Sequence, residues 1–309
     1  MHPTNYKNFW DDKATSYTGA LIAVDGSSDE SSVVATGARS ANQVAAALAL
    51  KSTDHVLELG CGVARIGVPL APRVGFWHGV DISQNMVDVA KQRLVGLENT
   101  AAQALTRPAL PFPDASFDAV YCIAVFIHMD KEDFFIYLRE IFRVLKLGGR
   151  VFFDHWNLAH PVGFKRFLYE ANFYDKHGDV GVRKDVARNQ FTTPQEVEVY
   201  LRQAGLSPTE IMHDTCWVQA LAVKGDQALV DAERIRITAA RDQINYGQAW
   251  TQYFDWVLPV VFEGVPPLAI LERLKSEPEG EVRAMYETWL LAAWRNNPGQ
   301  YGTVPNFYH

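Results

Sequence analysis

The sequence predicts an α/β fold in which helices cover both faces of a parallel sheet. Two observations support this prediction. From residue 55 to residue 157, short strand-like runs alternate with helical segments, which is the pattern of a parallel sheet built from strand–helix units. After residue 224 no strand pattern continues, and residues 226–309 are expected to form an all-helical C-terminal extension.

The expected strands are the apolar runs HVLELG at 55–60, FWHGVD at 76–81, FDAVYCIA at 117–124, RVFFDHW at 150–156 and CWVQALAVK at 216–224. Residues 99–105 carry only a weak strand pattern. The expected helices span 40–50, 83–94, 131–147 and 193–204. Ser83 is the expected N-cap of its helix, and a Ser/Asp/Gly stretch at 25–32 favours a loop.

These elements divide the chain into three parts. Residues 1–54 are expected to form a helical cap and loop, and residues 55–225 the sheet domain, with an insertion at about 159–190. The third part, residues 226–309, carries an apolar stripe at helical spacing, formed by Val282, Met285, Tyr286, Trp289, Leu290, Ala293 and Trp294. Such a stripe packs on a core of its own, or it forms a lid or a dimer surface.

Composition narrows the class of protein. The chain has 309 residues, 48% of them apolar and 21% charged, as in a soluble globular protein. A net charge of −7 argues against a general nucleic-acid binder. Three widely spaced cysteines favour a reducing compartment. No signal-peptide pattern and no membrane-length apolar run occurs, so a cytoplasmic protein without membrane attachment is expected.

The turn after the first strand reads Gly60-Cys61-Gly62. In a parallel sheet, ligands bind at the carboxyl ends of the strands, and this first turn is the usual place. The glycines permit backbone angles that a Cβ forbids, and they let a ligand approach the main chain. Asp81 closes the second strand about 20 residues later, where its carboxylate can accept hydrogen bonds from ribose hydroxyls.

Two kinds of cofactor compete for this turn. A dinucleotide site expects a third glycine in G-x-G-x-x-G, but Arg65 stands at that position and Gly67 comes two residues too late. Glu58, two residues before the turn, suits a cationic group better than a pyrophosphate. Both features disfavour a nicotinamide oxidoreductase, which is kept as an alternative.

Four ordered segments carry a resemblance to a known family. VLELGCGVARIG, GVDIS with Met86, LPFPDASFDAV, and IHM followed by REIFRVLKLGGRVFF resemble class I S-adenosylmethionine-dependent methyltransferases. The likeness is to the small-molecule branch related to ubiquinone and menaquinone methyltransferases, and it covers roughly residues 8–224. It implies a Rossmann-like sheet and S-adenosylmethionine as the cofactor.

The resemblance also implies roles for single residues. Glu58, Gly60, Cys61, Gly62 and Ile123 would lie at the methionine end of the cofactor, Asp81 at the ribose, Ile82 and Met86 at adenine, and Tyr17 and Arg39 at the carboxylate. Relatives usually place an acidic residue just before the LPF turn, to accept a hydrogen bond from the adenine amino group. Here that position is Thr106, with Leu105 beside it. Thr106 or backbone groups would therefore accept the hydrogen bond from adenine.

Methyl transfer requires proximity and orientation, and a hydroxyl acceptor must also lose a proton. Histidine suits that step, and His128 and His155 follow the two strands that should open on the sulfur. Asp154 could orient them. An aromatic wall for the acceptor is expected from Phe126, Trp156, Tyr169, Phe173 and Tyr174. No metal-ligand spacing occurs.

The leading hypothesis is a methyltransferase acting on a small-molecule acceptor, at oxygen in preference to nitrogen or carbon. The charged stretch at 176–189 would meet a polar part of that acceptor or remain solvated. The alternative is a non-catalytic S-adenosylmethionine-binding scaffold that acts through residues 226–309, which would also form any homo-oligomer contact.

Overall fold

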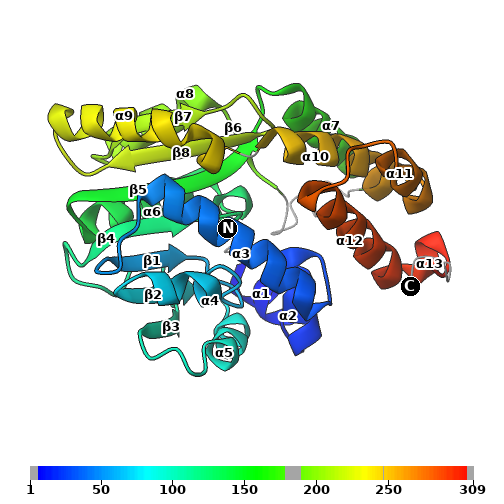
Figure 1. The fold of residues 1–309 in the computed structure, drawn as a ribbon, viewed down its shortest axis with the longest axis horizontal. Helices are drawn as coiled ribbons and strands as arrows, with labels where there is room; N and C mark the ends of the chain where they lie inside the picture. Colours follow the sequence, from blue (N-terminus) through cyan, green and yellow to red (C-terminus); the bar gives the residue numbers. More distant parts are fainter. Residues whose placement is uncertain (1–5, 178–188, 246, 305–309) are drawn as a thin grey trace.

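A mixed sheet forms the centre of the computed structural model, which describes residues 6–177, 189–245 and 247–304 (Figure 1). Its strand order is β3-β2-β1-β4-β5-β8-β7, and the short β6 pairs with β5. The first five strands run parallel, while β8 is antiparallel to both of its neighbours, β5 and β7. The expected parallel sheet is thus confirmed for β1–β5 and corrected at the β8–β7 edge.

The strands are β1 (His55–Leu59), β2 (Phe76–Asp81), β3 (Thr100–Ala104), β4 (Phe117–Cys122), β5 (Leu145–Asn157), β6 (Phe191–Thr192), β7 (Ser207–Met212) and β8 (Trp217–Val223). The weak segment at 99–105 is the edge strand β3. The sequence gives no strand pattern for β7, because SPTEIM contains a proline and few apolar residues. Proline is tolerated there because β7 lies at the edge of the sheet.

The helices of the sheet domain are α1 (Tyr6–Lys13), α2 (Tyr17–Asp25), α3 (Glu30–Leu48), α4 (Gly67–Leu70), α5 (Gln84–Arg93), α6 (Lys131–Val144), α7 (Pro161–His177), α8 (Pro194–Gln203) and α9 (Gln227–Ile244). Two 3-10 turns add η1 (Ala71–Arg73) and η2 (Phe126–His128). The expected N-cap of α5 is confirmed, since the Ser83 hydroxyl accepts the Met86 N–H at 3.1 Å.

Two local expectations need correction. The stretch at 25–32 is not one loop, because Gly26 ends α2 in the left-handed conformation and Asp29 caps α3 by accepting the Ser32 N–H at 3.0 Å. The helix expected to run to residue 147 ends at Val144, because Leu145 is already extended and starts β5.

Helices cover both faces of the sheet, as the sequence predicts (Figure 1). On one face, apolar side chains of α6 and α8 share a core with β1, β4 and β5. On the other face, α3 and α9 share a second core with the same sheet, through residues such as Val44 and Ile237. The Arg236 guanidinium also ties α9 to α3, because it donates to the carbonyls of Ala46 and Ala47 at the C-terminal end of α3.

Because α9 belongs to the sheet domain, the extension with a core of its own begins one helix after the expected boundary at residue 226. It comprises α10 (Gly247–Glu263), α11 (Pro267–Leu274), α12 (Glu281–Asn296) and α13 (Pro298–Tyr301). Its core is rich in aromatic rings, and Tyr286, Leu290 and Trp294 of the apolar stripe are buried in it. The stripe therefore packs on its own core at these positions, while the side chains of Val282 and Met285 lie outside the described part.

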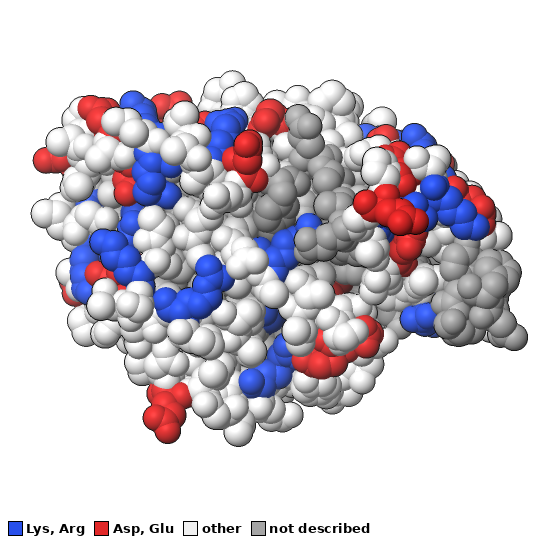
Figure 2. Space-filling model, in the orientation of Figure 1, with Lys and Arg blue, Asp and Glu red and all other residues white. Residues whose placement is uncertain are grey.

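Acidic and basic side chains are interspersed on the face of the molecule shown in Figure 2. No helix in the described ranges combines the length and the apolar character that crossing a membrane requires. All three cysteines, Cys61, Cys122 and Cys216, are buried free thiols.

Candidate functional site

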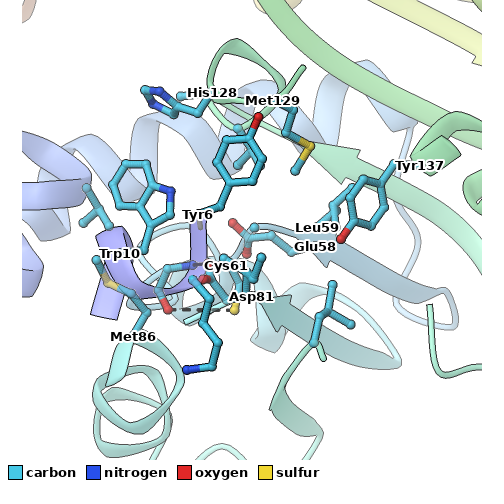
Figure 3. Close-up of a pocket in the computed structure, with 18 of the residues that line it drawn as sticks. Tyr6, Trp10, Glu58, Leu59, Cys61, Asp81, Met86, His128, Met129 and Tyr137 are labelled. Carbon is cyan, nitrogen blue, oxygen red and sulfur yellow. Dashed lines mark hydrogen bonds between the residues drawn. The ribbon is translucent and has the colours of Figure 1, made fainter. Parts of the chain in front are cut away.

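A cavity of about 450 Å³ lies at the carboxyl ends of β1, β2 and β4. The loops that follow β1, β3 and β4 form its floor and sides, and α1 lies across it (Figure 3). Eleven of the residues expected at the site line this cavity, namely Glu58, Gly60, Cys61, Gly62, Asp81, Ile82, Met86, Leu105, Thr106, Ile123 and His128.

The glycine turn is held tightly between β2 and the loop after β4. The Gly60 and Cys61 amides both donate to the Val80 carbonyl, at 2.7 and 3.0 Å. Gly60 has φ = +74°, and a Cβ at this position would lie 2.3 Å from the Val125 side chain. Glycine is therefore required at position 60, both for its backbone angle and for the close approach of Val125.

The Asp81 carboxylate is fixed at the end of β2 by two backbone amides. Its two oxygens accept the Gly62 N–H at 2.8 Å and the Ser83 N–H at 2.9 Å. Burial raises the pKa of Asp81, and hydrogen bonds from these amides oppose the rise. A carboxylate held in this way has lone pairs left for a pair of ligand hydroxyls.

Glu58 lies at the floor of the cavity in a buried chain of three side chains. The Trp77 indole donates to the Tyr121 hydroxyl at 2.9 Å, and that hydroxyl donates to Glu58 at 2.6 Å. Burial raises the pKa of Glu58 to about 8, and the Tyr121 hydrogen bond and the Arg65 charge oppose the rise.

Arg65 lines the cavity from the segment between β1 and α4. Its guanidinium donates to the Ser40 hydroxyl at 3.1 Å and lies 3.8 Å from the Asp25 carboxylate. From the sequence, this arginine was only a mismatch to a dinucleotide motif. In the structure it is a cation at the same end of the cavity as Glu58, whose pKa it lowers.

Helix α1 closes the cavity on the side opposite the strand ends. The Tyr6 hydroxyl accepts the Asp130 N–H at 3.0 Å, and the Asp11 carboxylate accepts the Ser83 hydroxyl at 2.7 Å. The Trp10 ring lies 5.1 Å from the His128 ring. Figure 3 shows Tyr6 and Trp10 among the residues that line the cavity. Sequence reasoning missed these residues, although the aromatic content of the N-terminal segment was a usable sign.

Two residues expected at the cofactor's carboxylate do not line the cavity. The Tyr17 hydroxyl donates to Glu30 at 2.8 Å on the surface, and Tyr17 is 41% exposed. Arg39 lies on α3; burial raises the pKa of the Tyr286 phenol on α12, and the Arg39 charge opposes this rise. Neither residue lines the cavity, whereas Arg65 does.

His155 also lies outside the cavity. It is 3% exposed, its ring lies 5.5 Å from the Phe134 ring, and burial lowers its pKa to about 4. It stands on the face of β5 that packs against α6. Asp154, the preceding residue, accepts the Ala124 N–H at 2.6 Å and so supports a residue that does line the cavity.

The described members of the expected aromatic wall, Phe126, Trp156 and Tyr169, are likewise not part of the cavity. Phe126 is buried against Phe134, Trp156 stacks on Trp217 at 4.3 Å, and the Tyr169 hydroxyl donates to Glu263. The side chains of Phe173 and Tyr174, and nearly all of the charged stretch at 176–189, lie outside the described residues. Within the described ranges no three His, Cys, Asp or Glu side chains gather as metal ligands.

Curated proteins similar to this chain include several that are named as methyltransferases. A family model described as a methyltransferase domain matches residues 56–149. O-methyltransferase resE of Aspergillus sclerotiorum is 37% identical over 132 residues, which cover 41% of this chain and 48% of that protein. The uncharacterized methyltransferase YcgJ of Bacillus subtilis is 36% identical over 115 residues, 36% of this chain and 45% of that protein. The chain thus spans about half the length of these curated relatives.

Two further matches cover a larger share of the matched protein. Demethylmenaquinone methyltransferase of Anoxybacillus flavithermus is 28% identical over 53% of this chain and 75% of that enzyme. The complex of the Trm112 methyltransferase activator with a putative methyltransferase from Haloferax volcanii matches with a TM-score of 0.50 and 16% identity. It covers 70% of this chain and 98% of that one, and it shows a shared fold.

The donor set of the cavity fits the cofactor of such enzymes. Glu58 and Arg65 offer a carboxyl group and a guanidinium near the glycine turn, where an amino acid's ammonium and carboxylate would be matched, and Asp81 offers a carboxylate for a ribose. The tight turn at Gly60 leaves no room for a side chain. Together with the family match over residues 56–149, these features identify a methyltransferase domain of the class I S-adenosylmethionine-dependent type within this chain.

Proposed function

We propose that this protein transfers the methyl group of S-adenosylmethionine to a small-molecule acceptor, at a hydroxyl oxygen in preference to nitrogen or carbon. One observation carries the proposal: a single cavity combines the Gly60 turn, the amide-held Asp81 carboxylate and His128, and α1 covers it. The bound cofactor supplies a methyl group that its sulfonium already activates. The chain's own residues then have to bind the cofactor and the acceptor, orient them and exclude water.

The methionine end of the cofactor is assigned to Glu58 and Arg65. A carboxylate facing an ammonium and a guanidinium facing a carboxylate are both charge-assisted pairs. Burial raises the pKa of Glu58 to about 8, so a cationic ligand group would bring that pKa down and release a proton. In this proposal Arg65 takes the role that the resemblance implied for Tyr17 and Arg39.

The adenine end is assigned to the segment after β3 and to Asp133 of α6. Residues 133, 137 and 140 lie on one face of α6, because they are spaced by four and three residues. On that face the Glu140 carboxylate accepts the Leu110 N–H at 2.8 Å, and Tyr137 shares a core with Leu105 and Leu110. Asp133, one turn earlier, lines the cavity opposite the same segment.

Asp133 therefore supplies the carboxylate that Thr106 lacks. The adenine amino group is a donor of two hydrogen bonds, and a carboxylate is an acceptor only. Burial raises the pKa of Asp133, which is consistent with a carboxyl group held at the inner side of a cavity. Thr106 and backbone groups also line the cavity and remain available to bind adenine together with Asp133.

The preference for oxygen rests on His128. A hydroxyl acceptor must lose its proton during transfer, and an imidazole is the common base for this step. His128 lines the cavity beside Trp10 of α1, whereas His155 does not. Relatives named as O-methyltransferases, resE and cnsE, agree with this choice, although a relative named sterol 4-C-methyltransferase also matches.

Titration calorimetry with S-adenosylmethionine and S-adenosylhomocysteine tests the cofactor assignment. We expect binding by the native protein and a loss of at least tenfold in affinity for Asp81→Ala. Asp88→Ala, an exposed position on α5, is the control and should bind normally. Undiminished binding by Asp81→Ala would refute the assignment. Binding without turnover on a panel of phenols, alcohols, amines and carbon acids would instead favour the non-catalytic scaffold.

A further inference from the structure

We infer that Glu140 and Arg143 of α6 are positioning residues for adenine recognition, because their side chains hold the loop that forms the adenine end of the cavity. Neither residue lines the cavity, and both act through the backbone of Leu110. The inference rests on the proposed function, in which adenine lies between this loop and Asp133. It gives a role to the segment REIFRVLKLGGRVFF, which carries part of the family resemblance and which the proposed function leaves without one.

The loop at residues 105–116 connects β3 to β4. All of its residues are described, and none of them belongs to a helix or a strand. One end is anchored where the Leu105 amide donates to the Asp81 carbonyl at 2.7 Å, and the other where the Ser116 amide donates to the last carbonyl of α6 at 2.8 Å. Residues 106–108 line the cavity between these anchors. Their position therefore depends on what holds the middle of the loop.

The Arg143 guanidinium holds the middle of the loop. It donates to the Leu110 and Phe112 carbonyls, each at 2.8 Å, and to the Asp114 carboxylate at 2.8 Å. Two further hydrogen bonds go to the Glu140 carboxylate, at 3.0 and 2.8 Å. These five bonds match the five N–H donors of a guanidinium, so the plane of this group and the path of the loop fix each other.

The Glu140 carboxylate completes this contact from the same helix. One of its oxygens accepts the Leu110 N–H at 2.8 Å as well as an N–H of Arg143, so α6 holds both backbone groups of Leu110. The hydrogen bond from Arg143 lowers the pKa of Glu140, which therefore stays ionised at neutral pH. Hydrogen bonds that involve a charged donor or acceptor are stronger than those between neutral groups. The loop is thus attached to α6 by charged groups on the helix.

Helix α6 therefore carries both walls of the adenine end on one rigid element. Asp133 lies near its N-terminal end, and Arg143 follows ten residues later, about 15 Å along the helix axis. Asp133 lines the cavity directly, while Arg143 fixes the loop that forms the other wall. The helix thus sets the distance between the two walls. Binding and orientation of a base between them require that both walls keep their places.

The consequence is a selective loss when the guanidinium is removed. The Leu110 and Phe112 carbonyls would lose their donor, and the middle of the loop would no longer be held against α6. The two ends of the loop would keep their own anchors on β2 and α6. Only contacts with adenine should weaken, because Glu58, Gly60 and Asp81 lie on other elements.

The test compares S-adenosylhomocysteine with S-ribosylhomocysteine, which lacks the adenine base. Displacement calorimetry measures the affinity of both ligands for the full-length native protein, Arg143→Met and Lys224→Met. Lys224 is the matched control, because its ammonium donates to the carbonyls of Phe142 and Leu145, each at 2.8 Å, where α6 passes into β5. Lys224→Met therefore also removes a cation that holds two backbone carbonyls near the end of α6.

We expect Arg143→Met to weaken binding of S-adenosylhomocysteine about tenfold and to leave binding of S-ribosylhomocysteine unchanged. Lys224→Met should lower the thermal midpoint and change neither affinity. Where Arg143→Met lowers the thermal midpoint too far for binding to be measured, Glu140→Gln replaces it. This variant keeps one acceptor oxygen but loses the charge, so S-adenosylhomocysteine alone should bind about threefold more weakly.

Equal weakening of both ligands by Arg143→Met, or the same selective loss in Lys224→Met, would overturn the inference while leaving the proposed function intact. Unchanged binding of S-adenosylhomocysteine by Arg143→Met, or by Glu140→Gln where it replaces that variant, would do the same. If the native protein binds both ligands equally well, the loop does not bind adenine, and the inference fails with that assignment. A native protein that binds neither S-adenosylmethionine nor S-adenosylhomocysteine would overturn the proposed function and the inference with it.

Discussion

Tyr121 and Glu58 face each other on neighbouring strands, and the Tyr121 hydroxyl donates a 2.6 Å hydrogen bond to the Glu58 carboxylate. Glu58 is 4% exposed, although it lines the cavity. Burial raises its pKa to about 8, and Tyr121 is the first of the groups that oppose this rise. The pair therefore keeps a titratable carboxyl group at the floor of the cofactor cavity.

This raised pKa makes stability depend on pH. Between the ordinary pKa of 4.5 and about 8, the folded state keeps a proton on Glu58 that the unfolded state releases. The free energy of unfolding should therefore fall as pH rises from about 5 to 8, by at most about 1.4 kcal/mol per pH unit, and level off above 8. Urea unfolding across this range measures the slope.

The matched variant for this prediction is Glu58→Gln, which cannot titrate. Asp154, whose pKa is raised to about 7, contributes a slope of the same sign in both proteins, so only the difference between them reports on Glu58. Identical slopes for the native protein and Glu58→Gln would contradict the prediction.

The glycine turn should not tolerate a methyl group at Gly60. Gly60→Ala places a Cβ 2.3 Å from Val125 at a positive φ, and we expect a loss of about 2–3 kcal/mol in unfolding free energy together with loss of cofactor binding. Gly96→Ala has a similar φ of +89° but meets nothing within 4 Å, so it should cost only about 1 kcal/mol. Urea unfolding and calorimetry of both variants check this, and equal effects would contradict it.

Residues next to the ends of β1 and β2 could be predicted from the sequence, because local patterns determine them. A glycine pair after an apolar strand, and an aspartate that closes the next strand, both depend on neighbours close in the chain. The Gly60 turn and Asp81 accordingly lie in one cavity. The edge strand β7 carries no such pattern, since Pro208 and Glu210 interrupt its apolar residues.

Residues that reach the cavity from helices could not be predicted in the same way. Whether Arg39 or Arg65 faces the cavity depends on how α3 docks on the sheet, and Gly37 decides that through direct contact with the Arg65 backbone. Tyr6 enters the site because α1 is tied to distant parts of the chain, through Asp130 and Ser83. Such tertiary contacts leave no periodic mark in the sequence.

Asp133 should determine recognition of the adenine amino group. In Asp133→Asn the side-chain amide can turn either an oxygen or an N–H₂ group toward the base, so affinity for S-adenosylhomocysteine should fall about tenfold. S-inosylhomocysteine carries an oxygen in place of the amino group. The native protein should reject it, and Asp133→Asn should bind it better than the native protein does.

Calorimetry with both ligands measures this change in specificity. Glu132→Gln, an exposed neighbour with the same change of charge, should leave both affinities unaltered. If Asp133→Asn weakens both ligands alike, the carboxylate does not read the amino group, and Thr106 or the backbone after β3 must do so.

The two histidines should behave differently in the reaction. Burial lowers the pKa of His155 to about 4, so its imidazole should stay neutral from pH 5 to pH 8 in an NMR titration. The free energy of unfolding should be independent of this group above pH 6.5 and fall as pH drops from 6.5 toward 4, because the unfolded state binds a proton at His155 that the folded state does not. His155→Gln should thus affect unfolding free energy, with no change in the pH profile of turnover.

His128→Gln should instead lower turnover about 10²-fold or more on a hydroxyl acceptor, because it removes the base from the cavity. Cofactor affinity should change little, since the assigned cofactor contacts lie on other residues. The measurement uses the acceptor found in the panel, with thermal midpoints to confirm folding. If turnover survives in His128→Gln and its pH profile is unchanged, the acceptor's proton leaves without this imidazole, and the assignment of His128 as the base is wrong.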